Sequence, residues 1–179
     1  QNIDLTIIDN AMGQLMAPGI DFGDFYFQHS KRENWTFEDG IVKDGAHSIE
    51  QGVGVRAVSG EKTGFAYSDS MDSASLLDSA RSARAISSGG NSFSHQSVKN
   101  AGTTTALYPA VDPVASMPAE QKVTLLRSVD AYVRSADSRV QKVTVSLAGA
   151  LDTILVVNSQ GVMAADIRPL VRLNVQVIV

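Results

Sequence analysis

The stretch of sequence that decides the fold is residues 49–69, which read IEQGVGVRAVSGEKTGFAYSD. Small apolar residues alternate with glycine, polar and charged residues through its first half, and this period of two is typical of a half-buried strand. Residues 59–64 combine glycines with charged residues, which is typical of a turn. Alternation resumes at residues 65–67. We therefore predict an antiparallel hairpin with one strand over 46–58 and its partner starting at residue 65.

The rest of the chain divides into strands, helices and turns by the same signals. We predict three helices: one over 4–16, one over 73–87 with Asp72 as its cap, and one from Pro118 onward with Leu126, Val129, Val133 and Ala136 buried. We predict strands around 25–27 and 35–37, at 41–43, and over 140–149, 153–158 and 162–179. We predict turns at Asp39-Gly40, Asp44-Gly45, Gly149-Ala150 and Ser159-Gln160-Gly161. Residues 88–104, rich in Ser, Gly, Asn and Thr, are predicted to be a mobile surface loop. The expected fold is α+β, with helices packed on a largely antiparallel sheet.

The last predicted strand is apolar on alternate positions from Val171 to Val179, which is the pattern of a half-buried strand. No turn residue or charge follows it, and an uncapped apolar edge strand recruits other chains. We expect this final strand to be open and the chain to continue beyond Val179 in the parent protein. The alternative is that the terminus pairs in the middle of a sheet and needs no further residues.

Composition excludes several classes of protein. The chain has 179 residues with 44% hydrophobic and 19% charged, ordinary values for a soluble globular protein, and no cysteine. A net charge of −4 without a basic run argues against nucleic acid or an anionic membrane as the main partner. No segment approaches the roughly 20 apolar residues of a membrane span. With no visible signal peptide, these features favour a cytoplasmic protein.

The sequence matches two glycine-rich binding motifs only in part. Residues 52–57, GVGVRA, match the dinucleotide pattern G-x-G-x-x-G/A, which requires a helix directly after the glycines. Strand sequence lies on both sides here, so we favour glycines that let another backbone approach or that mark a bulge. A phosphate loop between Gly54 and Thr63 is rejected, because its spacing is one residue too long and Glu61 would repel a phosphate.

A serine and a lysine form a second partial motif. Ser59-Gly60-Glu61-Lys62 matches the S-x-x-K of serine acyltransferases, which requires both side chains on one helical face. A polar hairpin turn is the favoured interpretation of these residues.

Histidines and arginines are the remaining candidates. His29 and His47 lie on predicted strands and could hold zinc with Glu33 or Glu50, although isolated strand histidines are more often simply hydrogen-bonded. Arg56, inside an apolar strand, and Arg168, before Pro169 at an expected strand break, could each reach a carboxylate or carbonyl in a cleft. For each arginine, the alternative is a side chain that snorkels at a sheet edge.

Four longer blocks of sequence are informative together, namely DFGDFYFQ at 21–28, EDGIVKDG at 38–45, QGVGVRAVSGEKTGFAY at 51–67 and AADIRPLVRL at 164–173. They resemble the TldD/PmbA family, and TldD more closely than its paralogue TldE. The resemblance implies a bacterial cytoplasmic zinc metalloprotease that acts on unfolded peptides together with a TldE partner chain.

In that family, the resemblance implies zinc bound by an H-E-x-x-x-H helix and a later cysteine, and neither occurs in this sequence. We therefore assign no catalytic or metal residue to the chain, and expect residues 1–179 to be an N-terminal domain that precedes the catalytic one. It would form part of the substrate cleft and of a dimer interface, with a TldE-like chain or a second copy. Arg56 and Arg168 are its candidate contact residues. The alternative is an autonomous peptide-binding or assembly module without hydrolytic activity.

Overall fold

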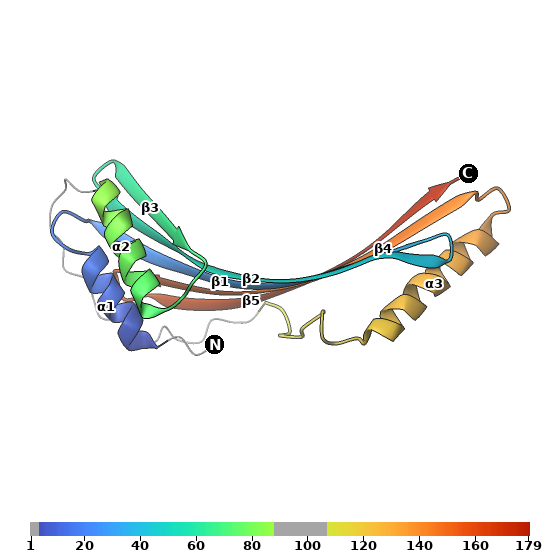
Figure 1. Ribbon diagram of the computed structural model, residues 1–179, viewed down its shortest axis with the longest axis horizontal. Coiled ribbons are helices and arrows are strands. Elements are labelled where there is room, and N and C mark those ends of the chain that lie inside the picture. The colour runs from blue at the N-terminus through green and yellow to red at the C-terminus, as the bar shows by residue number, and fades with distance from the viewer. Residues whose placement is uncertain (1–3, 88–106) are drawn as a thin grey trace. The chain divides into compact units, whose positions relative to one another are not determined.

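A computed structural model describes residues 4–87 and 107–179, and these build an α+β fold on a five-stranded antiparallel sheet, as predicted. The strands follow the order β3-β2-β1-β4-β5 (Figure 1). The elements are α1 Leu5–Leu15, β1 Phe22–Glu38, β2 Ile41–Ser59, β3 Lys62–Ser68, α2 Ser73–Ser87, α3 Ala119–Ala136, β4 Lys142–Asn158 and β5 Met163–Ile178. The predicted loop at 88–104 lies outside the described residues.

The chain folds into two compact units, and each of the strands β1, β2, β4 and β5 contributes to both of them. The described residues of the first unit fall within Gln1–His29, Glu50–Ala106 and Thr153–Asp166. Those of the second unit fall within Ser30–Ile49, Leu107–Asp152 and Ile167–Val179. Each unit has its own hydrophobic core.

Helices α1 and α2 pack against each other and supply one side of the first core (Figure 1). Helix α1 begins where the Asp4 side chain accepts a hydrogen bond from the Thr6 amide at 2.9 Å. Its buried side chains recur every three or four positions, which places them on one helical face. The fully buried residues of this core include Ile8, Met12 and Leu15 from α1, Phe25 from β1, Val53 and Val55 from β2, and Leu76 and Ala80 from α2.

Glycines in the segment 49–69 make room for their neighbours. A β-carbon at Gly64 would overlap the carbonyl oxygen of Ala83, so the glycine lets β3 approach the backbone of α2. A β-carbon at Gly52 would lie 2.7 Å from the Tyr67 hydroxyl and 3.0 Å from the carbonyl oxygen of Ser68. The backbone contact at Gly52 agrees with the interpretation that the glycines let another backbone approach. The Tyr67 ring is an additional neighbour of Gly52.

Helix α3 covers the core of the second unit. Its predicted stripe is confirmed at Leu126, which is fully buried, and at Val129 and Val133, which pack against the core. Ala136 is exposed, so the stripe ends one turn earlier than predicted. Fully buried Phe37, Val143 and Val145 complete this core. Pro118 is the cap of α3 rather than its first residue.

Arg134 fixes the last turn of α3 to the turn between β1 and β2. Its Nε donates to both carboxylate oxygens of Asp130 at 3.2 Å, and its Nη2 donates to Asp39 at 3.0 Å. Asp39 has a φ of 50° and Gly40 a φ of 83°, which matches the predicted Asp39-Gly40 turn.

Two predicted turns are wrong, because Asp44-Gly45 and Gly149-Ala150 both lie inside continuous strands. Each glycine faces a bulky neighbour instead. A β-carbon at Gly45 would lie 3.2 Å from the Trp35 ring, and one at Gly149 would lie 3.7 Å from Val114 Cγ2. The hairpin turn at 59–64 is also tighter than predicted, because Ser59 already pairs with Lys62.

The last strand differs from its prediction in burial. Strand β5 lies at one edge of the sheet, as expected for an open final strand. Leu170, Val171 and Leu173 are 65%, 60% and 45% exposed, so both faces of this part of the strand are open rather than one. The break expected at Arg168-Pro169 does not occur, since β5 runs unbroken from Met163 to Ile178. No helix within 4–87 or 107–179 is long and apolar enough to cross a membrane.

The contact at Gly64 gives a stability prediction. Gly64→Ala should lower the free energy of unfolding by about 1–3 kcal/mol, because strand and helix backbones must move apart. Denaturant titration followed by circular dichroism measures the change. Gly149→Ala is the matched control, since its β-carbon meets only ordinary contacts, and it should be neutral or slightly stabilising. Equal stability of Gly64→Ala and the parent chain would contradict the close approach.

The cap of α2 gives a pH prediction. Hydrogen bonds from the Ser70 hydroxyl and from the amide and hydroxyl of Ser75 lower the pKa of Asp72 to about 2, from 3.8. A lowered pKa contributes stability that is present above pH 3.8 and is lost as the pH falls toward 2. The wild-type chain should therefore have a higher denaturation midpoint than Asp72→Asn at neutral pH, and this excess should shrink as the pH falls across this interval. Ser70→Ala, which removes one donor, should reduce the excess measured at neutral pH; an excess independent of pH would contradict the cap.

Candidate functional site

Arg56 projects from β2 in the first unit and forms an ion pair with Asp24 of β1. Its Nε donates to Asp24 Oδ2 at 2.9 Å, and its Nη2 contacts the same oxygen. The guanidinium also lies 5.8 Å from the centre of the Phe22 ring. The hydrogen bond to Asp24, and then its charge, raise the pKa of Arg56 above its usual value. About half of the side chain remains exposed, at 49%, so part of it is accessible to another molecule.

An aromatic surface surrounds this ion pair. Arg56 is the cross-strand partner of Phe65, which together with Tyr67 belongs to β3. Phe65 and Tyr67 are 59% and 66% exposed. Tyr26 lies two residues beyond Asp24 on β1, therefore on the same face, and is also exposed. We call Asp24, Tyr26, Arg56, Phe65 and Tyr67 the aromatic face of the first unit.

The other candidates from the sequence lie elsewhere. Arg168 is exposed on β5 in the second unit, whereas Arg56 belongs to the first. His29 and His47 likewise belong to different units. Within the described residues, no group of three or more His, Cys, Asp or Glu side chains is placed to hold a metal ion.

Ser59 and Lys62 face each other across the hairpin, and the structure shows no catalytic pair there. Ser59 is buried, and its Oγ has no hydrogen-bond partner among the described residues, Lys62 included. A lysine that activates a serine must accept its proton through such a contact. The hairpin interpretation of this motif therefore agrees with the structure.

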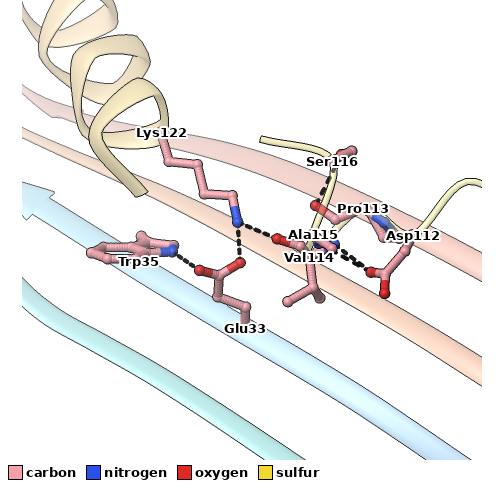
Figure 2. Close-up of polar contacts among 8 residues, drawn as sticks. All are labelled: Glu33, Trp35, Asp112, Pro113, Val114, Ala115, Ser116 and Lys122. Atoms are coloured by element: carbon pink, nitrogen blue, oxygen red, sulfur yellow. Dashed lines mark hydrogen bonds and ion pairs between the residues drawn. The ribbon is translucent and has the colours of Figure 1, made fainter. Parts of the chain in front are cut away.

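The second unit contains a buried ion pair between Glu33 of β1 and Lys122 of α3 (Figure 2). The two side chains are 12% and 5% exposed. The second oxygen of Glu33 accepts a hydrogen bond from the Trp35 indole nitrogen at 2.6 Å. Lys122 Nζ also donates to the carbonyl oxygen of Val114 at 2.7 Å. The pair therefore links a strand, a helix and the loop that leads to the helix.

That loop is held by Asp112, as Figure 2 shows. The Asp112 carboxylate accepts hydrogen bonds from the amides of Val114 and Ala115 at 2.9 and 3.2 Å, and from Lys31 Nζ at 3.1 Å. Burial alone would raise the pKa of Asp112, but the hydrogen bonds from Ala115, Lys31 and Val114 outweigh it and lower the pKa. The Ser116 hydroxyl donates to the carbonyl oxygen of Pro113 at 3.3 Å. The loop is thus fixed at several points.

A pocket of about 140 Å³ lies beside the ion pair. Its walls come from β1, the loop, α3, β4 and β5. They are Glu33, Trp35, Pro113, Ser116, Met117, Lys122, Leu125, Leu147, Ala148, Gly149 and Val171. Most of this lining is apolar, and its charged groups are the two members of the ion pair. We call it the α3 pocket.

Sequence reasoning missed this site although two signals for it were present. Lys122 lies four residues before Leu126 and therefore on the buried stripe of the helix. Glu33 lies two residues before Trp35 and shares its strand face. Opposite charges on two apolar faces indicate a buried pair, because a lone buried charge is very costly.

Two family models match the chain, as PmbA/TldA metallopeptidase domain 1 over residues 23–87 and as the central domain of the same metallopeptidases over residues 112–179. The chain belongs to the TldD/PmbA metallopeptidase family. The family resemblance in the sequence is therefore confirmed. The boundary between the matched segments does not coincide with the two compact units, since each unit draws residues from both segments.

Relatives within the TldD/PmbA family are longer than this chain. It is 43% identical over 99% of its length to the metalloprotease TldD homolog of Haemophilus influenzae, and covers 37% of that protein. It is 41% identical over 89% of its length to the corresponding homolog of Buchnera aphidicola subsp. Schizaphis graminum, and covers 33% of it. The chain thus spans only about a third of the length of either relative.

Solved structures show the same fold at low identity. TldE from Thermococcus kodakarensis superposes with a TM-score of 0.71 at 13% identity, over 94% of this chain and 39% of that one. A putative modulator of DNA gyrase from Bacteroides thetaiotaomicron gives a TM-score of 0.71 at 14% identity, over 96% of this chain and 40% of that one. At such identities the likeness shows the fold alone.

The buried ion pair gives a double-mutant prediction. Lys122→Met should cost about 3–5 kcal/mol of unfolding free energy, because it leaves the Glu33 carboxylate buried without a counter-charge. Glu33→Met should cost a similar amount for the reverse reason. The double variant should be more stable than either single one, since no buried charge remains. Denaturant titration of the four proteins gives the coupling energy; strictly additive losses would contradict a coupled pair.

Proposed function

We propose that this chain is the N-terminal, non-catalytic part of a TldD-type zinc metallopeptidase that degrades or processes unfolded peptides. The single observation that carries the proposal is the 43% identity to the metalloprotease TldD homolog of Haemophilus influenzae over 99% of the chain. Because the chain spans 37% of that relative, the activity is proposed for the longer parent protein. We assign the zinc ligands to a part of the parent outside residues 1–179, because the family's H-E-x-x-x-H motif is not in this sequence.

In this proposal the chain lines part of the substrate cleft. The aromatic face supports that role, because it combines exposed rings with a half-exposed arginine side chain. Rings bind peptide side chains of many kinds, and a guanidinium can donate to a peptide carbonyl. Both properties suit a peptidase that tolerates varied sequences. Arg56 is the side chain that we propose for this contact.

We also propose that the second unit contributes to a dimer interface. The edge strand β5 carries exposed apolar side chains that include Leu170, Val171 and Leu173. Among the described residues β3 pairs only with Val53–Ser59, so the first part of β2 is a sheet edge too. Edges of this kind are normally covered. A TldE-like chain or a second copy would cover them, and Arg168 on β5 would contact that partner.

The proposed setting is the cytoplasm, with no nucleic acid or membrane as partner. The net charge of −4 supports this, because surfaces that bind phosphate backbones or anionic lipids are basic. The second candidate function is an autonomous peptide-binding or assembly module. The exposed aromatic face favours it, because binding needs no metal.

An activity assay tests the main proposal. The parent protein loaded with zinc should cleave an unfolded peptide, and chelation should abolish the cleavage. The chain 1–179 with added zinc should show no turnover above buffer, because we assign it no metal ligand. Chelator-sensitive turnover by 1–179 alone would overturn the non-catalytic assignment. A parent protein that binds peptides without cleaving them would favour the binding-module alternative.

Arginine variants of the parent protein test the contact residues in the same assay. Arg56→Gln should raise the KM several-fold with a smaller effect on kcat, as expected for loss of a substrate contact. Arg168→Gln should weaken dimer formation, measured by light scattering. Arg127→Gln, at an exposed position of α3, is the control for loss of a surface arginine. Unchanged KM for Arg56→Gln would remove Arg56 from the substrate cleft.

A further inference from the structure

We propose that the α3 pocket binds one apolar side chain of a peptide, together with the neutral carbonyl oxygen next to it. The proposal rests on the size of the pocket, on the hydrogen-bonding capacity of Lys122 and on the exposure of the pocket walls. It does not depend on the proposed peptidase function, because it concerns binding by the second unit alone.

The volume and lining of the pocket fit one side chain. An apolar cavity of about 150 Å³ accepts a benzene molecule, and the α3 pocket holds about 140 Å³. Trp35, Leu125, Leu147 and Val171 provide apolar walls, and Met117 provides an adaptable one. A leucine, methionine or phenylalanine side chain suits this space. Removing it from water supplies the main driving force for binding.

Lys122 provides the polar part of the site. An ammonium group has three protons to donate. Within the described residues, Lys122 Nζ has two acceptors, Glu33 and the carbonyl of Val114 (Figure 2). One donor is therefore left on a group whose side chain is only 5% exposed. A buried donor without an acceptor is costly, so a ligand oxygen placed there is favoured.

The charge of the pair selects among possible ligands. Glu33 neutralises Lys122, so an anion would gain little from Lys122 and would be repelled by the carboxylate. A cation is disfavoured because both Glu33 oxygens already accept hydrogen bonds, from Trp35 and from Lys122. A neutral acceptor fits best, and in a peptide that acceptor is the backbone carbonyl.

The walls of the pocket reach the surface, so a ligand can enter. Val171 is 60% exposed and Leu125 is 36% exposed. Gly149 on β4 adds no side chain to the wall of the pocket, and a β-carbon built there would only be at ordinary contact distance from Val114 and Pro113. A peptide can thus insert a side chain without unfolding the unit.

Methyl NMR of the chain 1–179 tests this binding. The probes are N-acetyl-leucinamide, N-acetyl-phenylalaninamide and N-acetyl-glycinamide. The first two should shift the methyl signals of Leu125, Leu147 and Val171, with Kd values on the order of millimolar as expected for ligands of this size. N-acetyl-glycinamide should bind at least about tenfold more weakly, because it lacks the apolar side chain. No shift at these methyl groups, or equal binding of the three probes, would overturn the proposal.

Variants separate the two parts of the site. Gly149→Val should fill the pocket and weaken N-acetyl-leucinamide at least about tenfold. Leu147→Phe, on the same strand face and in the same lining, serves as a second filling variant if the first does not fold. Ala150→Val, on the opposite face of the same strand, is the control and should bind like the wild-type chain. The double variant Glu33→Met/Lys122→Met should lose about tenfold in affinity through the missing donor. Undiminished binding to both folded filling variants would place the probe elsewhere and overturn the assignment.

Discussion

The buried ion pair between Glu33 and Lys122 is the constraint on which the second unit depends. Each charge would be strongly destabilising alone, so α3 must lie where the Lys122 ammonium reaches the strand. That position brings Leu126 onto Val143 and Val145 and places the loop carbonyl of Val114 within 2.7 Å of the same nitrogen. One electrostatic requirement therefore selects the register of a helix, and apolar packing then stabilises that register.

Glycines serve different purposes within the second unit, and this explains which turns the sequence predicted well. Asp39-Gly40 is a true turn, because both residues need positive φ. Gly45 and Gly149 look similar in the sequence, yet they lie within strands and make room for Trp35 and for the loop at Val114. Local sequence cannot separate these cases, because the neighbour that requires a glycine is distant along the chain. Helices α1 and α2 are predicted closely, because the periodicity that indicates them lies within the local sequence.

The candidate sites show the same limit. Arg56 was recognisable as a charge within an apolar strand, but its partner Asp24 lies 32 positions away and appears only after folding. Lys122 and Glu33 were each visible as a charge on an apolar face, and only their pairing makes a pocket wall. The blocks at 38–45 and 51–67 identified the family without revealing either geometry. Residue types thus predicted the kinship of the chain better than the contacts within it.

The sharing of strands between the two units has a consequence for how the chain folds during synthesis. The first core includes Val157, and Met163 packs against it. Both residues follow the first residues of this core, such as Ile8, by more than half of the chain. The Gly23 amide donates a hydrogen bond to the Ser159 hydroxyl oxygen, 136 positions away in the sequence. In an emerging chain, one side of β1 therefore stays unpaired until β4 has left the ribosome. Folding dominated by such distant contacts is slow, so the nascent chain is a natural client for chaperones that shield unpaired strands.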